Sequence, residues 1–150
     1  MGYRITVHAG ETGHSQNVID AIELLGAERI GHAVAIQHDT QAINLVREKG
    51  VFLETCPTSN LQTKAVASYQ AHPLGYFLRQ DLPLSINTDN RTVSQVNMSQ
   101  EIQYVSEAQL LSAQDYQRIY QQSVVAAFCE PSLKKKIVEL FRRFINFYYF

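Results

Sequence analysis

Short runs of β-branched and other apolar residues alternate along the chain with longer segments in which apolar residues recur every three or four positions. The short runs predict buried strands, and they lie at 4–7, 29–31, 51–55 and 84–87. The longer segments predict helices with one buried face, because residues three or four apart share a face. The first of these segments lie at 16–25, at 40–49 and from 73 onward.

Further helical patterns follow the fourth strand and occupy the rest of the chain. Apolar stripes of helical period predict helices over 99–107, 112–128 and 131–147. Thr40 is the expected N-cap of the second helix, and the turn formers of 56–60 predict a long loop. Strands that alternate with helices indicate a parallel sheet with helical crossovers, which makes the chain an α/β protein.

Charge and cysteine content exclude several classes of protein. Charged residues make up 18% of the sequence and the formal net charge is -1, so nothing favours binding to nucleic acid. The sequence contains no 18-residue apolar span and no signal-peptide pattern, so we expect neither a membrane partner nor secretion. Cys56 and Cys129 lack a C-x-x-C spacing, and we expect two reduced thiols in a cytoplasmic protein.

Polar residues follow each predicted strand at its carboxyl end. His8 and Glu11 follow the first strand and His32 follows the second. Glu54 and Thr55, with Asn60, mark the end of the third strand, and Asp89 and Asn90 follow the fourth. In parallel α/β proteins these ends lie on one rim, where successive loops build a single site. A lone H-A-G-E segment fits a structural histidine before a helix equally well, and it is the repetition along the chain that favours a site.

His8 and Asp89 have the chemistry of zinc ligands, since imidazole nitrogen and carboxylate oxygen both bind this metal. A catalytic zinc ion takes about three protein ligands and a water molecule. His32 is either a third ligand or a base beside that water. The remaining histidines are expected to be ordinary surface or helix-end residues: His14, His38 and His72.

Five motifs occur in the order found in the adenosine deaminase family. They are H-A-G-E at 8–11, R-I-G-H at 29–32, E-T-C-P-T-S-N at 54–60, H-P-L at 72–74 and S-I-N-T-D-N at 85–90. The sequence resembles the C-terminal half of a bacterial member from about residue 3 to residue 140. The resemblance implies a zinc-dependent (β/α)8 barrel that converts adenosine, and 2′-deoxyadenosine, to inosine-type products and ammonia.

The resemblance also implies roles for individual residues. His8 matches a zinc ligand, and Asp89 matches an aspartate that binds zinc and steers the attacking water. Glu11 matches the acid that protonates the purine ring at N1, and His32 matches the histidine that orients this water and acts on it as a base. The chemistry agrees, because attack at C6 breaks ring aromaticity and a proton at N1 absorbs the developing charge.

Gly10 and Asn90 are the residues expected to bind the purine. The family has an aspartate at the second of these positions, which contacts N7. An amide always has N–H groups to donate, whereas a carboxyl group must first be protonated, so Asn90 is compatible with a purine.

An H-x-H zinc pair of the family and its first four βα units have no counterpart in this sequence. We therefore expect residues 1–150 to form the C-terminal part of the barrel domain, with its N-terminal half absent. Two alternatives to an adenosine deaminase remain. One is a non-catalytic half-barrel that oligomerises through its open edges, and the other is a relative that acts on AMP, adenine or another aminopurine.

The expected cofactor is Zn²⁺, and the expected partners are a purine nucleoside together with a second copy of the chain or a complementary N-terminal half. The isolated chain is expected to be inactive. An aromatic C-terminus would add to its exposed surface, and comprises Phe141, Phe144, Phe147, Tyr148, Tyr149 and Phe150.

Overall fold

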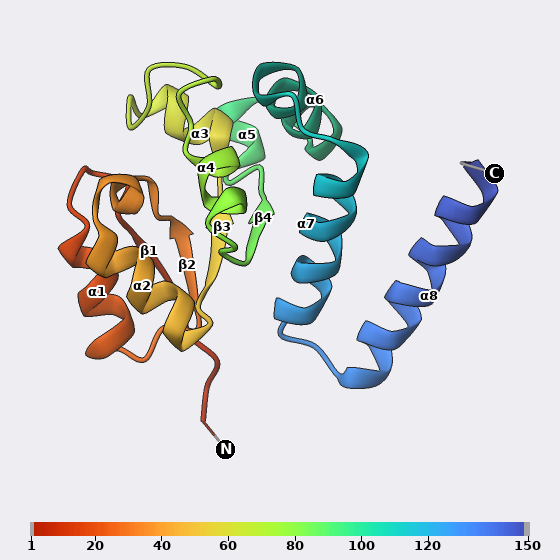
Figure 1. The fold of residues 1–150 in the computed structure, drawn as a ribbon, viewed down its shortest axis with the longest axis horizontal. Coiled ribbons are helices and arrows are strands. Elements are labelled where there is room, and N and C mark those ends of the chain that lie inside the picture. Colours follow the sequence, from red (N-terminus) through yellow and green to blue (C-terminus); the bar gives the residue numbers. More distant parts are fainter. Residues whose placement is uncertain (1, 149–150) are drawn as a thin grey trace.

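Four strands form one parallel sheet whose spatial order follows the order of the chain (Figure 1). This computed structural model describes residues 2–148, with the side chains of the last helix described as far as residue 142. Each strand after the first is hydrogen-bonded to the strand that precedes it, in parallel register. The strands are β1 (Thr6–Ala9), β2 (Arg29–His32), β3 (Phe52–Thr55) and β4 (Leu84–Ile86).

Three helices connect the strands and cover one face of the sheet. They are α1 (Gln16–Glu23), α2 (Thr40–Lys49) and α4 (Leu74–Arg79). Ile30, Leu53 and Leu84 are fully buried and belong to the core cluster that these helices complete. Four βα units arranged side by side in this way are half of a (β/α)8 barrel, and the predicted fold class is confirmed.

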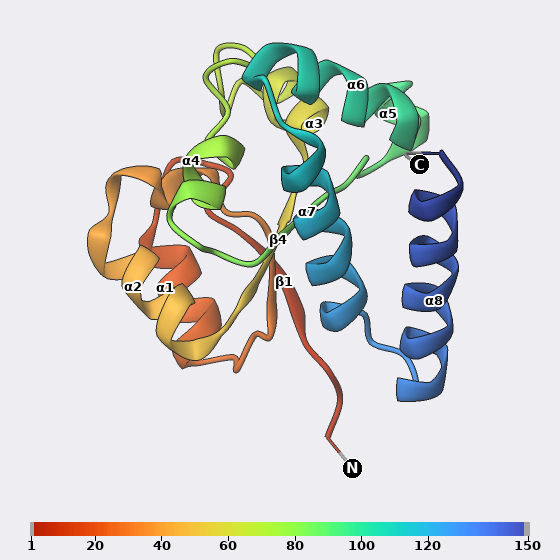
Figure 2. The same cartoon turned by 45° about the vertical axis from the view of Figure 1, so that its right-hand side comes forward.

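Three longer helices follow β4, as the sequence predicts: α6 (Met98–Gln109), α7 (Ala113–Ala126) and α8 (Pro131–Tyr148). Helix α7 lies along β4, and the side-chain oxygen of Gln122 accepts a hydrogen bond from the Leu84 amide. Helix α8 lies beside α7 in both views (Figure 2). Phe141 stacks on Tyr120 with ring centroids 3.8 Å apart, and the later aromatic side chains lie outside the described residues.

The structure corrects the sequence prediction in four places outside the strands. The expected loop at 56–60 is largely helix α3 (Pro57–Gln62), because a proline at the first helical position is compatible with helix geometry. The short helices η1 (Val34–His38) and α5 (Arg91–Ser94) were not predicted. The N-cap of α2 is Asp39 and not Thr40, since the Asp39 carboxylate accepts a hydrogen bond from the Ala42 amide.

The first strand is not buried as its sequence predicts. Strand β1 lies at the edge of the sheet, and Thr6 and His8 are exposed on the face opposite the helices. On the same face Arg29 and Glu54 form an ion pair 3.2 Å long, beside a cavity of about 500 Å³ between the sheet and α7. No helix within residues 2–148 is long and apolar enough to cross a membrane.

Candidate active site

Glu11 and His32 meet at the carboxyl ends of β1 and β2. Glu11 Oε2 lies 3.6 Å from His32 Nε2, and the His32 side chain is almost fully buried. Gly10 makes the turn between β1 and Glu11 with φ +72°, and an added Cβ would lie 2.8 Å from Val18 Cγ2. The position therefore requires glycine for backbone reasons, whether or not it also contacts a ligand.

His8 lies beside His32 on the exposed side of the rim. The two rings meet edge to face, with centroids 4.9 Å apart and an interplanar angle of 85°. Gly31 allows this approach, because a Cβ at that position would lie 2.7 Å from His8 Cδ2. The R-I-G-H motif thus supplies both His32 and the space that the His8 ring occupies.

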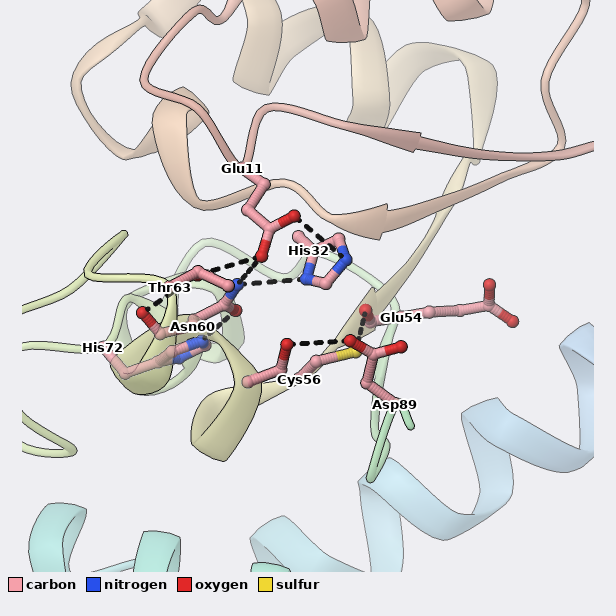
Figure 3. A network of polar contacts seen from close by, with 9 residues as sticks. Glu11, His32, Glu54, Cys56, Asn60, Thr63, His72 and Asp89 are labelled. Atoms are coloured by element: carbon pink, nitrogen blue, oxygen red, sulfur yellow. Dashed lines mark hydrogen bonds and ion pairs between the residues drawn. The ribbon is translucent and has the colours of Figure 1, made fainter. Parts of the chain in front are cut away.

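A chain of buried hydrogen bonds continues from His32 into the protein (Figure 3). His32 Nδ1 lies 3.0 Å from Asn60 Nδ2, and Asn60 Oδ1 lies 3.1 Å from His72 Nε2. Thr63 Oγ1 donates to Glu11 Oε1 over 3.0 Å, and Asn60 Nδ2 is 3.5 Å from the same oxygen. Helix α3 and the residue that follows it therefore hold both members of the Glu11–His32 pair.

Asp89 and Asn90 stand at the end of β4. Asp89 adopts a left-handed backbone with φ +52°, a strained conformation for a residue other than glycine, and its Oδ2 accepts a hydrogen bond of 2.7 Å from Ser59 Oγ. Asn90 is the N-cap of α5, and its Oδ1 accepts a hydrogen bond from the Val93 amide. Since the cap uses the oxygen, the amide nitrogen is the atom of Asn90 that could donate to a ligand.

Burial shifts the pKa of three side chains in and behind the site. Burial lowers the pKa of His32 below its ordinary value, while the Glu11 carboxylate acts in the opposite direction. Burial also lowers the pKa of His72 to about 3, with His32 contributing in the same sense. Burial, together with the charge of Asp89, raises the pKa of the Cys56 thiol, so Cys56 is a buried thiol of low reactivity.

The residues present match a zinc site in kind but not in number. His8 and Asp89 offer an imidazole nitrogen and a carboxylate oxygen, which zinc accepts. Within residues 2–148, however, no three His, Cys, Asp or Glu residues form a group that could hold a metal ion. Among the described residues, His8 and Asp89 are therefore candidates for only part of a ligand set.

The structure brings some of the predicted site residues together at the rim and places other histidines elsewhere. Glu11, His32 and His8 gather at the rim, and the Asp89 carboxylate is close enough for its charge to act on His32. His72 is not a surface residue, because it is 3% exposed and hydrogen-bonded to Asn60. His14 and His38 are exposed, as expected.

Sequence reasoning placed Asn60 among the polar residues after the third strand without giving it a role, and it missed Thr63. Both lie in or next to the segment that was predicted as a loop, and a loop gives no indication of which side chains point inward. The E-T-C-P-T-S-N and H-P-L motifs contain Asn60 and His72, so the order of motifs was the one available signal. Glu54 has a structural role, since it forms an ion pair with Arg29 and points away from the network in Figure 3.

A half-barrel with histidines and carboxylates at the carboxyl ends of its strands has the layout of (β/α)8-barrel proteins, whose sites lie on this rim. The family assignment is more specific. Residues 1–143 match the model of the adenosine deaminase family, and the chain belongs to this family.

A relative found by sequence agrees with that assignment, and solved structures agree with the fold. The chain is 50% identical over 136 residues to an adenosine deaminase of Clostridium perfringens, which covers 91% of this chain and 41% of that protein. Among solved structures, an adenine deaminase from Arthrobacter aurescens matches 97% of this chain and 44% of its own with a TM-score of 0.91 and 23% identity. An amidohydrolase from Burkholderia ambifaria with bound zinc matches 97% of this chain and 41% of its own, with a TM-score of 0.84 and 22% identity. The chain thus spans about two fifths of the length of its relatives.

Proposed function

We propose that this chain is the C-terminal part of a zinc-dependent enzyme of purine salvage that hydrolyses adenosine and 2′-deoxyadenosine to inosine-type nucleosides and ammonia. The observation that carries the proposal is the buried His32 ring facing Glu11 at 3.6 Å, with His8 against the same ring. An acid and an imidazole placed side by side at a barrel rim suit the addition of water to an aromatic ring. The related protein from C. perfringens is named an adenosine deaminase, and this name supports the choice of substrate.

Each residue then has a defined task. Glu11 donates a proton to purine N1 as water adds at C6, and Thr63 holds the acid through its other oxygen. His32 orients the attacking water from its position beside Glu11. Asn90 donates its amide N–H to N7, and Gly10 allows the purine to approach the backbone after β1.

His8 and Asp89 are the proposed zinc ligands of this chain. When bound, zinc would make hydroxide available near neutral pH by lowering the pKa of a coordinated water. The Burkholderia structure with bound zinc supports this choice of metal. The remaining ligands would come from a segment outside this chain, such as the expected N-terminal half.

A chimaera tests the assignment of the acid. The N-terminal part of the C. perfringens relative is joined to this chain, and inosine formation is measured with and without Glu11→Gln. The substitution keeps the shape of the side chain and removes its proton, so kcat should fall by at least about 10²-fold while zinc content is unchanged. Glu23→Gln, on α1 and exposed, is the matched control. A Glu11→Gln chimaera with nearly full activity would show that the proton comes from elsewhere.

A second substrate class is supported by the Arthrobacter neighbour, which is an adenine deaminase. The same residues would bind the purine ring in either case. Adenine and AMP are therefore the competing substrates to compare with adenosine. The kcat/KM of the chimaera for adenosine should exceed its kcat/KM for either competitor. A preference for adenine or AMP would reassign the enzyme without changing the roles of Glu11 and His32.

The 150-residue chain alone is proposed to be cytoplasmic, inactive and self-associating. Strand β1 is an edge strand with an exposed face, and open edges favour pairing with another chain. Light scattering after size-exclusion chromatography should give more than one copy per particle, and zinc analysis should give less than one ion per chain. A zinc-loaded monomer that forms inosine would refute this part of the proposal.

A further inference from the structure

We propose that Asn60 and His72 are positioning residues that fix the ring proton of neutral His32 on Nε2, the nitrogen that faces Glu11. The inference follows from hydrogen-bond donors and acceptors that admit one consistent arrangement (Figure 3). Its consequence for catalysis rests on the proposed function, whereas the proton arrangement itself does not.

The arrangement begins at a group that can only donate. The backbone N–H of Leu74 donates to His72 Nδ1 over 3.2 Å, so this nitrogen carries no proton. His72 is buried and its pKa is about 3, so the ring is neutral and its single proton is on Nε2. His72 Nε2 therefore donates its proton to the atom 3.1 Å away, which is Asn60 Oδ1.

That hydrogen bond orients the Asn60 amide. With the oxygen directed to His72, the NH₂ group is directed to His32 and donates to His32 Nδ1 over 3.0 Å. Asn60 has no exposed surface, so water does not compete for either end of the amide. Its backbone is held as well, because the Val66 amide donates to the Asn60 carbonyl over 3.2 Å.

The last step gives the state of His32. A nitrogen that accepts a hydrogen bond has no proton, so the neutral ring carries its proton on Nε2. This N–H lies at the rim, with Glu11 Oε2 3.6 Å away. The donor direction of the Leu74 amide, at the start of α4, thus reaches the rim through two buried side chains, His72 and Asn60.

The consequence for the reaction is a change in the expected role of His32. A neutral ring with a proton on Nε2 donates a hydrogen bond to the water oxygen, or to the charge that develops on it, and cannot accept a proton at that atom. The arrangement therefore assigns His32 to orienting and electrostatic stabilisation and not to general-base catalysis.

Nitrogen NMR of the 150-residue chain labelled with ¹⁵N-histidine tests the proposal, since the ring shifts separate the two tautomers. At about pH 8, where ordinary imidazoles are neutral, His72 and His32 should both be Nε2–H tautomers. Single replacements of the exposed His14 and His38 by Gln assign the spectrum and serve as controls. An Nδ1–H tautomer at His32 in the unchanged chain would overturn the proposal.

Variants show whether Asn60 and His72 cause this state. Asn60→Asp keeps the side-chain shape but replaces the donor by an acceptor, so His32 should switch to the Nδ1–H tautomer while His72 is unchanged. In the His72→Gln variant the glutamine amide can still donate to Asn60 Oδ1, so the Nε2–H signal of His32 should be preserved. In the His72→Leu variant that donor is gone, and His32 should no longer be uniformly in the Nε2–H state. The two His72 variants decide the matter if Asn60→Asp does not fold.

An unchanged Nε2–H tautomer at His32 in the His72→Leu chain would show that the two residues do not position the proton. The activity assay tests the proposed function and not the proton arrangement. A chimaera without deaminase activity but with the expected tautomers would refute the proposed function and leave the proton arrangement intact.

Discussion

The buried His72 should make the stability of the fold depend on pH in a range where most carboxylates are still ionised. Its pKa falls from 6.5 in the unfolded chain to about 3 in the folded protein. Between these values the unfolded chain binds a proton that the folded protein does not, so stability decreases as pH falls below 6.5. At about pH 5 the loss is about 2 kcal/mol relative to about pH 7.5, from the linkage relation.

This loss of stability hardly depends on the pKa that His72 has in the folded protein. At about pH 5 the loss depends on the unfolded pKa alone, provided that the folded pKa lies about a unit or more below that pH. Urea unfolding of the 150-residue chain and of its His72→Gln variant, at both pH values, measures it. The decrease between the two pH values should be larger in the unchanged chain by about 2 kcal/mol.

His38→Gln, which removes an exposed imidazole, is the matched control and should retain the full decrease. Equal pH dependence in the unchanged and His72→Gln chains, within about 0.5 kcal/mol, would refute the reasoning, because a protonated His72 would then be tolerated in the folded state.

Other substitutions test the rim and the core. In the chimaera, His8→Ala and Asp89→Ala should each abolish stoichiometric zinc, as measured by metal analysis, and full retention in either would remove that residue from the ligand set. Gly31→Ala should move the His8 ring, because the new Cβ would lie 2.7 Å from His8 Cδ2, and the chimaera should bind zinc more weakly. Phe77→Ala, at a fully buried position, should lower the free energy of unfolding by about 3–5 kcal/mol in urea titrations, and a loss below about 1 kcal/mol would contradict the packing described.

The sheet and its rim could be predicted because each depends on local sequence. Alternation of apolar runs and periodic segments located four strands, and the polar residues after them placed Glu11 and His32 at neighbouring ends. The burial of β1 was wrong, because an apolar run does not reveal whether its strand lies at an edge. Helix α3 was missed for a local reason, since the turn formers after Cys56 also suit the first turn of a helix.

The hydrogen-bond chain behind the site could not be predicted from the sequence. Asn60 and His72 belong to different elements and are brought together by the path between α3 and α4, which has no regular period. An asparagine among turn formers and a histidine before a proline both have simpler local explanations. Only the tertiary fold shows that the two side chains are buried and face each other.

The order of the strands also bears on how the chain reaches its structure. Each strand pairs with the one made just before it, and equal stretches of chain separate Thr6 from its partner Arg29 and Arg29 from its partner Phe52. The longer connection from Leu53 to Leu84 raises the entropic cost of closure by only about 0.3 kcal/mol, because this cost grows with the logarithm of length. Each βα unit can therefore dock as soon as it leaves the ribosome, and no strand has to wait for a partner from the far end of this chain.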